Sequence, residues 1–230
     1  MKYDLFLVDA DDTILNFHAS SRAALIETFE AFGYPWQTRY GEEFFRFNAG
    51  LWERLERKEI TRDELMDTRF TLFLRLLGIT DVCGEQFNEF FLRHLSTHPI
   101  YFEGAEVFLK TLGKVGKVYV VTNGTAWIQK SRFDISNLWQ YADDVFISQL
   151  IGADKPAKEY TDYVVSHIPN FQQNRAIWIG DSLSADIRAA KDAEIDSIWF
   201  NPQKKRGSNA IIPTYVAASY GEILQILGIN

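Results

Sequence analysis

Cysteine and long hydrophobic segments are scarce in this sequence. Cys83 is the single cysteine among 230 residues, so the chain can form no internal disulfide and cannot build a zinc site from several thiolates. No segment approaches the roughly 18 consecutive apolar residues of a membrane-spanning helix. The segment Met1-Lys2-Tyr3-Asp4 carries an acid where a signal peptide would carry bases, and no small-residue cleavage site follows. We therefore expect a cytoplasmic protein with no membrane partner.

Basic residues are also fewer than acidic residues. Lys and Arg number 24 against 31 Asp and Glu, which gives a formal net charge of −7. A protein that coats nucleic acid needs a basic face, so we expect no polymeric nucleic acid as a partner. The sequence lacks the Gly-x-Gly-x-x-Gly and P-loop patterns, and its four histidines have no mutual spacing typical of a metal site. Any bound phosphate must be held by local positive groups rather than by the overall field.

Two patterns of hydrophobicity divide the chain. Residues 3–8 are apolar and predict a short buried strand, whereas residues 20–98 show helical periodicity and no convincing strand. Beyond them, short apolar runs alternate with helical segments, which is typical of a parallel sheet covered on both faces. We predict an α/β fold in which residues 1–16 and 101–230 form a doubly wound, Rossmann-like parallel sheet. Residues 17–100 are predicted to form an inserted, all-helical domain.

The position of the insertion matters for function. The segment Thr61-Arg-Asp-Glu64 has the pattern of a capping box at the start of a helix. In open α/β sheets, ligands bind beyond the carboxyl ends of the strands. Because the insertion leaves the sheet directly after the first strand, we expect it to cover the ligand site as a cap.

Two acids, Asp9 and Asp11, follow the first predicted strand. Two carboxylates this close repel each other, which raises the pKa of one of them unless a cation intervenes. Such a pair can supply a nucleophile and a proton donor. The alternative is a polar turn that closes the strand, since Asp is common in turns.

Three later segments place polar residues at strand ends or at the start of a helix. The first offers a hydroxyl, an amide and backbone N–H groups that could hold an anion. The second offers a lysine that could neutralise a phosphate, and the third offers acids that could ligate a hard cation through oxygen. Taken singly, each could instead be a helix N-cap or a solvated lysine. The segments are Thr122-Asn123-Gly124, Lys155-Pro156, and Gly180-Asp181 with Asp186.

Because the fold would bring these segments together, they jointly predict a magnesium-assisted phosphoryl site. In order and spacing they resemble the four motifs of the haloacid dehalogenase (HAD) superfamily of phosphohydrolases, over the whole chain. Asp12 departs from the commonest pattern, which has Gly at this position. An acid there resembles the branch with pyrimidine 5′-nucleotidase activity. The motif residues are Asp9-x-Asp11-x-Thr13, Thr122, Lys155 and Gly180-Asp181…Asp186.

The resemblance implies a covalent mechanism. Asp9 would attack phosphorus and form a phospho-aspartyl intermediate, while Asp11 would protonate the leaving alcohol and then deprotonate the hydrolytic water. A phosphate monoester is a dianion, so an anionic nucleophile needs positive charge around it. Oxygen ligands favour Mg²⁺ over zinc for this purpose. The implied residues are Asp9, the backbone carbonyl of Asp11 and Asp181 for Mg²⁺, Thr122, Asn123, Gly124 and Lys155 for the phosphate, and Thr13 and Asp186 in support.

Substrate choice must come from the cap, because the sheet domain contacts only the phosphate. Trp52 could stack on a base and Asn48 could hydrogen-bond its edge, or both could belong to the core of the helical domain. The resemblance to the nucleotidase branch implies a small phosphate ester, a pyrimidine nucleoside monophosphate, as the substrate. Phenylalanines at helical spacing in the same helices are expected in the core. Arg69 could reach the substrate or pair with a cap acid, and we expect the second. The alternatives are a phosphosugar phosphatase or mutase, a metal-independent 2-haloacid dehalogenase, against which Asp11 argues, and a catalytically silent binding module.

Overall fold

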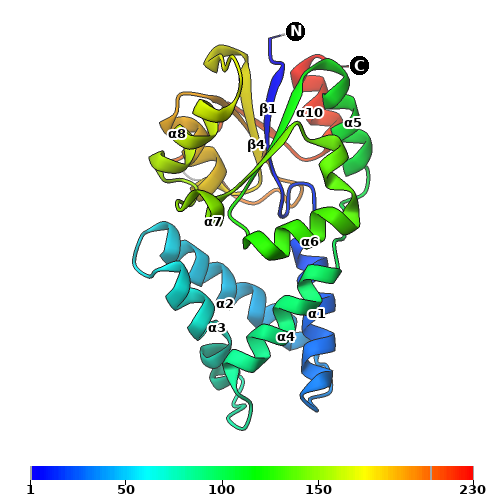
Figure 1. The fold of residues 1–230 in the computed structure, drawn as a ribbon, viewed down its shortest axis with the longest axis vertical. Helices are drawn as coiled ribbons and strands as arrows, with labels where there is room; N and C mark the ends of the chain where they lie inside the picture. Colours follow the sequence, from blue (N-terminus) through cyan, green and yellow to red (C-terminus); the bar gives the residue numbers. More distant parts are fainter. Residues whose placement is uncertain (1, 208, 230) are drawn as a thin grey trace. The chain divides into compact units, whose positions relative to one another are not determined.

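The computed structural model describes residues 2–207 and 209–229, and the chain forms two compact units. Residues 1–16 and 100–230 make up an α/β unit, and residues 17–99 make up a helical unit. The chain leaves the α/β unit shortly after its first strand and returns just before α5 (Ala105–Val115) (Figure 1).

Six parallel strands form the sheet of the α/β unit, in the order β3-β2-β1-β4-β5-β6. The chain moves outward from β1 to β3 and then returns to the other side of β1, which is the doubly wound arrangement. The fold class predicted from the sequence is therefore confirmed. The strands are β1 (Leu5–Asp9), β2 (Lys117–Thr122), β3 (Asp144–Ile147), β4 (Ala176–Gly180), β5 (Asp196–Phe200) and β6 (Tyr215–Ala217).

Helices cover both faces of this sheet. Figure 1 shows α5 and α10 on one side of the strands and α8 on the other. The helical elements that follow α5 are α6 (Ala126–Ser136), η1 (Leu138–Tyr141), α7 (Ser148–Ile151), α8 (Lys158–His167), η2 (Gln173–Arg175), η3 (Leu183–Ile187), α9 (Arg188–Asp192) and α10 (Tyr220–Leu227).

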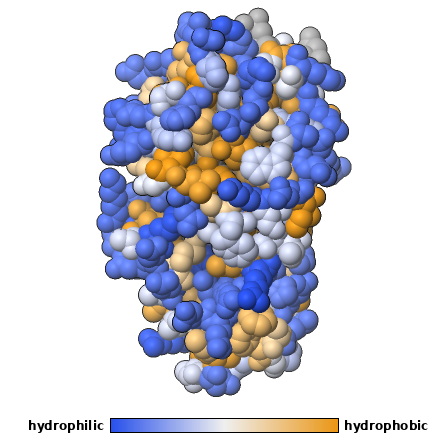
Figure 2. Space-filling model, in the orientation of Figure 1, coloured by the Kyte–Doolittle hydropathy of each residue, from blue (hydrophilic) through white to orange (hydrophobic). Residues whose placement is uncertain are grey.

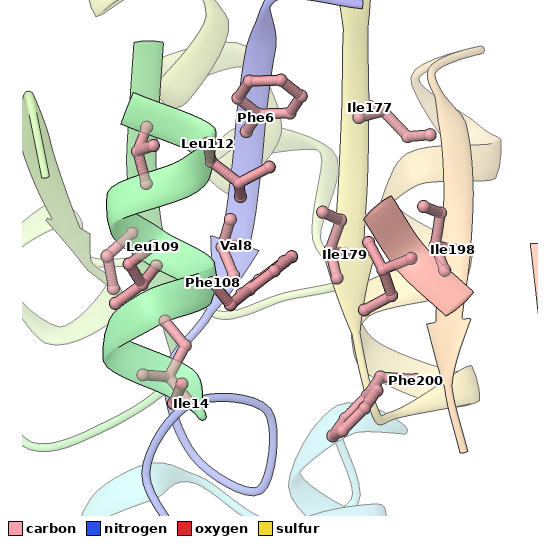
Figure 3. Close-up of a cluster of buried hydrophobic side chains, with 14 of the residues drawn as sticks. Phe6, Val8, Ile14, Phe108, Leu109, Leu112, Ile177, Ile179, Ile198 and Phe200 are labelled. Carbon is pink, nitrogen blue, oxygen red and sulfur yellow. The ribbon is translucent and has the colours of Figure 1, made fainter. Parts of the chain in front are cut away.

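Side chains of β1 alternate between two hydrophobic clusters. Phe6 and Val8 pack with α5, where Phe108 is almost completely buried (Figure 3). Leu5 and Leu7 join the cluster on the opposite face. Because both faces of the strand are buried, its sequence is a continuous apolar run rather than an alternation. Truncating a side chain such as Phe108 to Ala in this core costs about 3–5 kcal/mol.

Two parts of the sheet unit differ from the sequence-based expectation. The short strand β6 was not predicted, because three residues of strand carry too little pattern to detect, and helix α10 was not predicted either. The second is the segment from Leu183 to Ala193, whose sequence pattern is that of one α-helix; it begins as a π-helical turn, η3, and continues as α9. Within η3 the Ile187 N–H donates to the Ser182 carbonyl at 3.1 Å, five residues back, and the turn carries Asp186.

The helical unit has a core of aromatic side chains. Phe44 and Phe70 stack at 5.3 Å between ring centroids, and both are fully buried, as expected from their spacing. The predicted capping box is confirmed, with Glu64 N–H donating to Thr61 Oγ1 at 3.1 Å and Thr61 N–H donating to Glu64 Oε2 at 2.8 Å. The helices are α1 (Phe17–Ala31), α2 (Thr38–Glu56), α3 (Arg62–Leu76) and α4 (Gly84–Thr97).

Hydrophilic residues make up most of the surface on the face drawn in Figure 2, and hydrophobic residues are exposed in smaller areas. Over residues 2–207 and 209–229, none of the helices combines the length and the hydropathy of a membrane span.

Candidate active site

Three strand ends meet at one edge of the sheet. In the register of the sheet, Asp9 at the end of β1 lies opposite Val121 of β2, one residue before Thr122. On the other side Val8 lies opposite Ile179 of β4, so Asp9 is level with Gly180. Parallel pairing therefore brings the segments that begin at Asp9, Thr122 and Gly180 to one place, as their position after strands predicts.

Lys155 lies at the centre of this edge and is 2% exposed. Its Nζ donates to Asp9 Oδ1 at 2.6 Å, to Asp186 Oδ1 at 2.7 Å and to the Val121 carbonyl at 2.9 Å. These three acceptors match the three protons of an ammonium group. Burial opposes the charge of Lys155, but the carboxylates of Asp186 and Asp9 outweigh it and raise the pKa of the ammonium above its ordinary value.

The side chain of Asn123 fixes the backbone that carries Lys155. Asn123 Oδ1 accepts the Lys155 N–H at 2.8 Å, and Asn123 Nδ2 donates to the Lys155 carbonyl at 2.9 Å. This pair of hydrogen bonds joins the loop after β2 to the loop before α8. In this structure the Asn123 amide thus holds Lys155, and a phosphate contact by Asn123 stays a prediction.

Three carboxylates gather around the lysine. Oxygens of Asp9, Asp181 and Asp186 all lie within 4.8 Å of one another. Burial raises the pKa of Asp9 to about 8, against the opposing effect of Lys155. Burial and then the charge of Asp9 raise the pKa of Asp181 well above its ordinary value. One ammonium does not neutralise three carboxylates, so the site favours a further cation.

The donor chemistry of this cluster fits magnesium. All three side chains offer oxygen, which suits a hard divalent ion. Asp186 already accepts from Lys155 and, through Oδ2, from the Ser182 N–H at 3.1 Å. Asp9 and Asp181 are therefore the members best able to serve as direct ligands. The carboxylate of Asp11 is not part of this group, and the predicted role of its backbone carbonyl is untested.

Asp11 is instead held by helix α6. Arg132 NH1 donates to Asp11 Oδ1 at 2.7 Å, and Gln129 Nε2 donates to Asp11 Oδ2 at 2.8 Å. Gln129 and Arg132 were not identified from the sequence. The available signal was a Gln and an Arg three residues apart on a helix face that also carries Ile128 and Phe133, which are buried.

Two glycines make room for these side chains. A Cβ on Gly124 would lie 2.4 Å from Gln129 Cγ, and a Cβ on Gly180 would lie 2.3 Å from Asp186 Cγ. The Gly124 N–H, predicted to face a phosphate, donates to Thr122 Oγ1 at 3.1 Å. Thr13, predicted in support, is fully buried next to the motif acids in the chain, and its carbonyl accepts from a tyrosine hydroxyl of α10.

The predicted specificity residues lie within the helical unit. Asn48 is buried and its Oδ1 accepts from Arg69 NH1 at 3.4 Å. Trp52 is half-buried, with the Arg62 guanidinium 5.4 Å from its ring centroid. Arg69 donates to Asn88 Oδ1 at 2.7 Å, and no ion pair joins it to an acid within the described residues, contrary to expectation. Burial lowers the pKa of Arg69 to about 9.

Comparison with known proteins agrees with this geometry. A family model described as a haloacid dehalogenase-like hydrolase matches residues 3–194. YfnB of Bacillus subtilis, named as an HAD-hydrolase, is 36% identical over 229 residues, which cover 100% of this chain and 97% of YfnB. A crystal structure of YfnB bound to magnesium matches with a TM-score of 0.94 at 35% identity, over 100% of both chains.

Two further relatives carry the name of an activity. PynA of Streptococcus pneumoniae, a pyrimidine 5′-nucleotidase, is 32% identical over 231 residues, covering 100% of this chain and 97% of PynA. YjjG of Escherichia coli, also a pyrimidine 5′-nucleotidase, is 26% identical over 227 residues, covering 99% of each chain. The family resemblance seen in the motifs is confirmed: the chain belongs to the haloacid dehalogenase-like hydrolases.

Proposed function

We propose that this protein is a magnesium-dependent phosphomonoester hydrolase that forms a phospho-aspartyl intermediate on Asp9 and acts on pyrimidine nucleoside 5′-monophosphates. The observation that carries the proposal is the buried cluster in which Lys155 holds Asp9 beside Asp181 and Asp186. Its surplus of negative charge suits a divalent cation, and its position at the carboxyl ends of β1, β2 and β4 suits a ligand.

Asp9 is arranged as a nucleophile. Lys155 takes Oδ1 and so fixes the orientation of the carboxylate, whereas no hydrogen bond joins Oδ2 to the described residues. Attack by a carboxylate oxygen on phosphorus forms an O–P bond, and the bond from phosphorus to the ester oxygen breaks. Magnesium held by Asp9 and Asp181 would supply positive charge that lowers the repulsion between the acid and the phosphate dianion.

Asp11 would perform the proton transfers. The electron pair of the broken ester bond stays on the alcohol oxygen, which takes a proton from Asp11. The Asp11 carboxylate then takes a proton from the water that attacks the acyl phosphate, so that inorganic phosphate leaves and Asp9 is restored. These transfers are worth about 10²–10⁴ in rate.

The Thr122 hydroxyl is arranged to donate a hydrogen bond to the phosphate. Its Oγ1 accepts hydrogen bonds from Gln129 Nε2 at 2.9 Å and from the Gly124 N–H at 3.1 Å. A hydroxyl has two acceptor positions and one proton. With both acceptor positions used, the proton of Thr122 is the part left to bind an anion.

The pyrimidine preference rests on relatives rather than on the site. PynA and YjjG are both named pyrimidine 5′-nucleotidases and match nearly the full length of this chain. Asn48 and Trp52 supply an amide and an indole of the kinds that bind a base edge and a base face. We propose that these two side chains contribute to the choice of base.

A phosphate-release screen tests the proposal. Uridine, thymidine, adenosine and guanosine monophosphates and hexose phosphates are compared with and without Mg²⁺, with Asp9→Asn as the inactive control. We expect metal-dependent release that is greatest for the pyrimidines. Faster hydrolysis of purines or hexose phosphates would remove the nucleotidase assignment and leave the phosphatase, whereas an active Asp9→Asn variant would remove the covalent mechanism.

A further inference from the structure

Gln129 and Arg132 are buried polar residues of α6 to which the family motifs give no role. Each is 1% exposed, and their spacing of three residues puts them on one face of the helix. Helices normally bury apolar side chains, and a buried guanidinium is costly unless an acid compensates its charge. The burial of these two side chains must therefore be explained by the group that they bind.

The group that they hold is the carboxylate of Asp11. Arg132 NH1 donates to one oxygen at 2.7 Å and Gln129 Nε2 donates to the other at 2.8 Å. Gln129 Oε1 in turn accepts from Arg132 NH1 at 2.8 Å, which fixes the two donors relative to each other. Within the described residues, Asp11 is the one acid that pairs with Arg132. The carboxylate is thereby fixed in both position and orientation.

Gln129 also connects Asp11 to the phosphate-binding loop. The same Nε2 that donates to Asp11 donates to Thr122 Oγ1 at 2.9 Å. The close passage of Gln129 over this loop is what excludes a side chain at Gly124, where a Cβ would lie 2.4 Å from Gln129 Cγ. The single buried side chain of Gln129 therefore contacts both Asp11, the proposed proton donor, and Thr122, the proposed hydrogen-bond donor to the phosphate.

We propose that Gln129 and Arg132 are positioning residues that orient Asp11 for proton transfer to the leaving alcohol and hold it in register with Thr122. This inference rests on the proposed phosphatase function. As the ester O–P bond breaks, its electron pair stays on the alcohol oxygen, and Asp11 supplies the proton that this oxygen takes. A carboxylate that is free to rotate supplies that proton less often, although the nucleophile and the phosphate contacts are intact.

Leaving groups of different basicity isolate this step. The alcohol of uridine monophosphate needs a proton to leave, whereas the phenolate of p-nitrophenyl phosphate leaves without one. The ratio kcat/KM reports the steps up to departure of the leaving group, so it reports Asp11 as an acid and not its later action on water. Loss of positioning should lower kcat/KM for the nucleotide by about 10–100-fold more than for the aryl ester.

Three variants and one control carry the test. Arg132→Met and Gln129→Met remove the donors while keeping much of the side-chain volume. Arg132→Lys keeps the charge and should retain most activity, because only one of the three guanidinium nitrogens has a partner; Nε and NH2 are buried without one among the described residues. Lys130→Met removes a cation from the exposed face of α6 and should leave kcat/KM for both substrates unchanged.

The outcomes separate positioning from a merely structural role. A selective loss on uridine monophosphate in Gln129→Met and Arg132→Met, with recovery in Arg132→Lys, supports the inference. Equal losses on both substrates, or no loss, overturn it. If Arg132→Met fails to fold by circular dichroism, Gln129→Met and Arg132→Lys decide the matter alone. A wild-type protein that hydrolyses neither ester refutes the proposed function itself, which is a different result from a uniform loss in the variants.

Discussion

Replacing Asp9 with Asn should stabilise the metal-free protein at alkaline pH. Burial raises the pKa of Asp9 from an ordinary value of 3.8 to about 8. Between these two pH values the folded state keeps a proton that the unfolded state has lost. Because the folded state binds more protons, the free energy of unfolding falls as the pH rises through this window, by up to roughly 1.4 kcal/mol per pH unit. The penalty is absent below about pH 4.

The size of the effect follows from the width of the window. Between pH 5 and pH 8 the wild-type protein should lose about 4 kcal/mol through this single carboxyl group. The attraction of Lys155 is already contained in the pKa near 8, so it offsets no more of the loss. Asn is nearly isosteric, keeps an oxygen for Lys155 to bind and carries no charge. The advantage of Asp9→Asn over wild type should therefore widen by about 4 kcal/mol from pH 5 to pH 8.

Urea unfolding in EDTA at pH 5, 6, 7 and 8 measures this difference. Asp162→Asn, which changes an exposed acid of α8, is the matched control and should run parallel to wild type. Added Mg²⁺ should restore wild-type stability at pH 8 and do much less for Asp9→Asn. If the stabilities of wild type and Asp9→Asn stay parallel from pH 5 to pH 8, the site carries no uncompensated charge at Asp9 and the electrostatic reasoning is refuted.

Three further predictions use the same assays. Asp11→Asn should have the opposite effect on stability, lowering the free energy of unfolding by about 1–3 kcal/mol because Arg132 loses its carboxylate; a variant as stable as wild type would contradict this. EDTA should stop phosphate release and Mg²⁺ should restore it, and indifference to chelation would contradict the metal assignment. Gly180→Ala should cost about 1–3 kcal/mol and reduce activity, because the new Cβ would lie 2.3 Å from Asp186 Cγ. Gly113→Ala in α5, where a Cβ meets nothing within 4 Å, is its control and should be neutral or stabilising.

The convergence of the strand ends could be predicted because it depends on a general property of parallel sheets. Asp9, Thr122 and Gly180 each end or follow an apolar run that reads as a strand, and parallel strands place their carboxyl ends at one edge. Lys155 could be predicted only together with the other segments, since it precedes a helix and a lysine there, taken alone, is expected to be solvated. Its contact with Asp9 at 2.6 Å depends on the hydrogen bonds by which Asn123 joins the loop after β2 to the loop before α8. No local sequence pattern predicts these hydrogen bonds.

The α6 residues could not be predicted for a different reason. A Gln and an Arg on a mostly buried helix face are read as solvated side chains, because burying them is usually unfavourable. Only the tertiary structure shows that Asp11 compensates Arg132 and that Gly124 leaves space for Gln129. Helix α10 was missed although the sequence carries a signal for it, since Ser219 caps the helix by accepting from the Glu222 N–H at 3.2 Å.

The structure gives the two acids of the first loop different environments although they stand two residues apart. Asp9 is 5% exposed and is held by Lys155, while the half-buried Asp11 is held by Arg132. Each acid thus has its own buried cation, and the two cations come from different sides, one from the loop before α8 and one from α6. Two carboxylates that must perform different chemistry need such separate surroundings, because identical surroundings would give them the same reactivity. If Arg132 contributes to that difference, then removing it while both acids are kept should impair catalysis, which is what Arg132→Met measures.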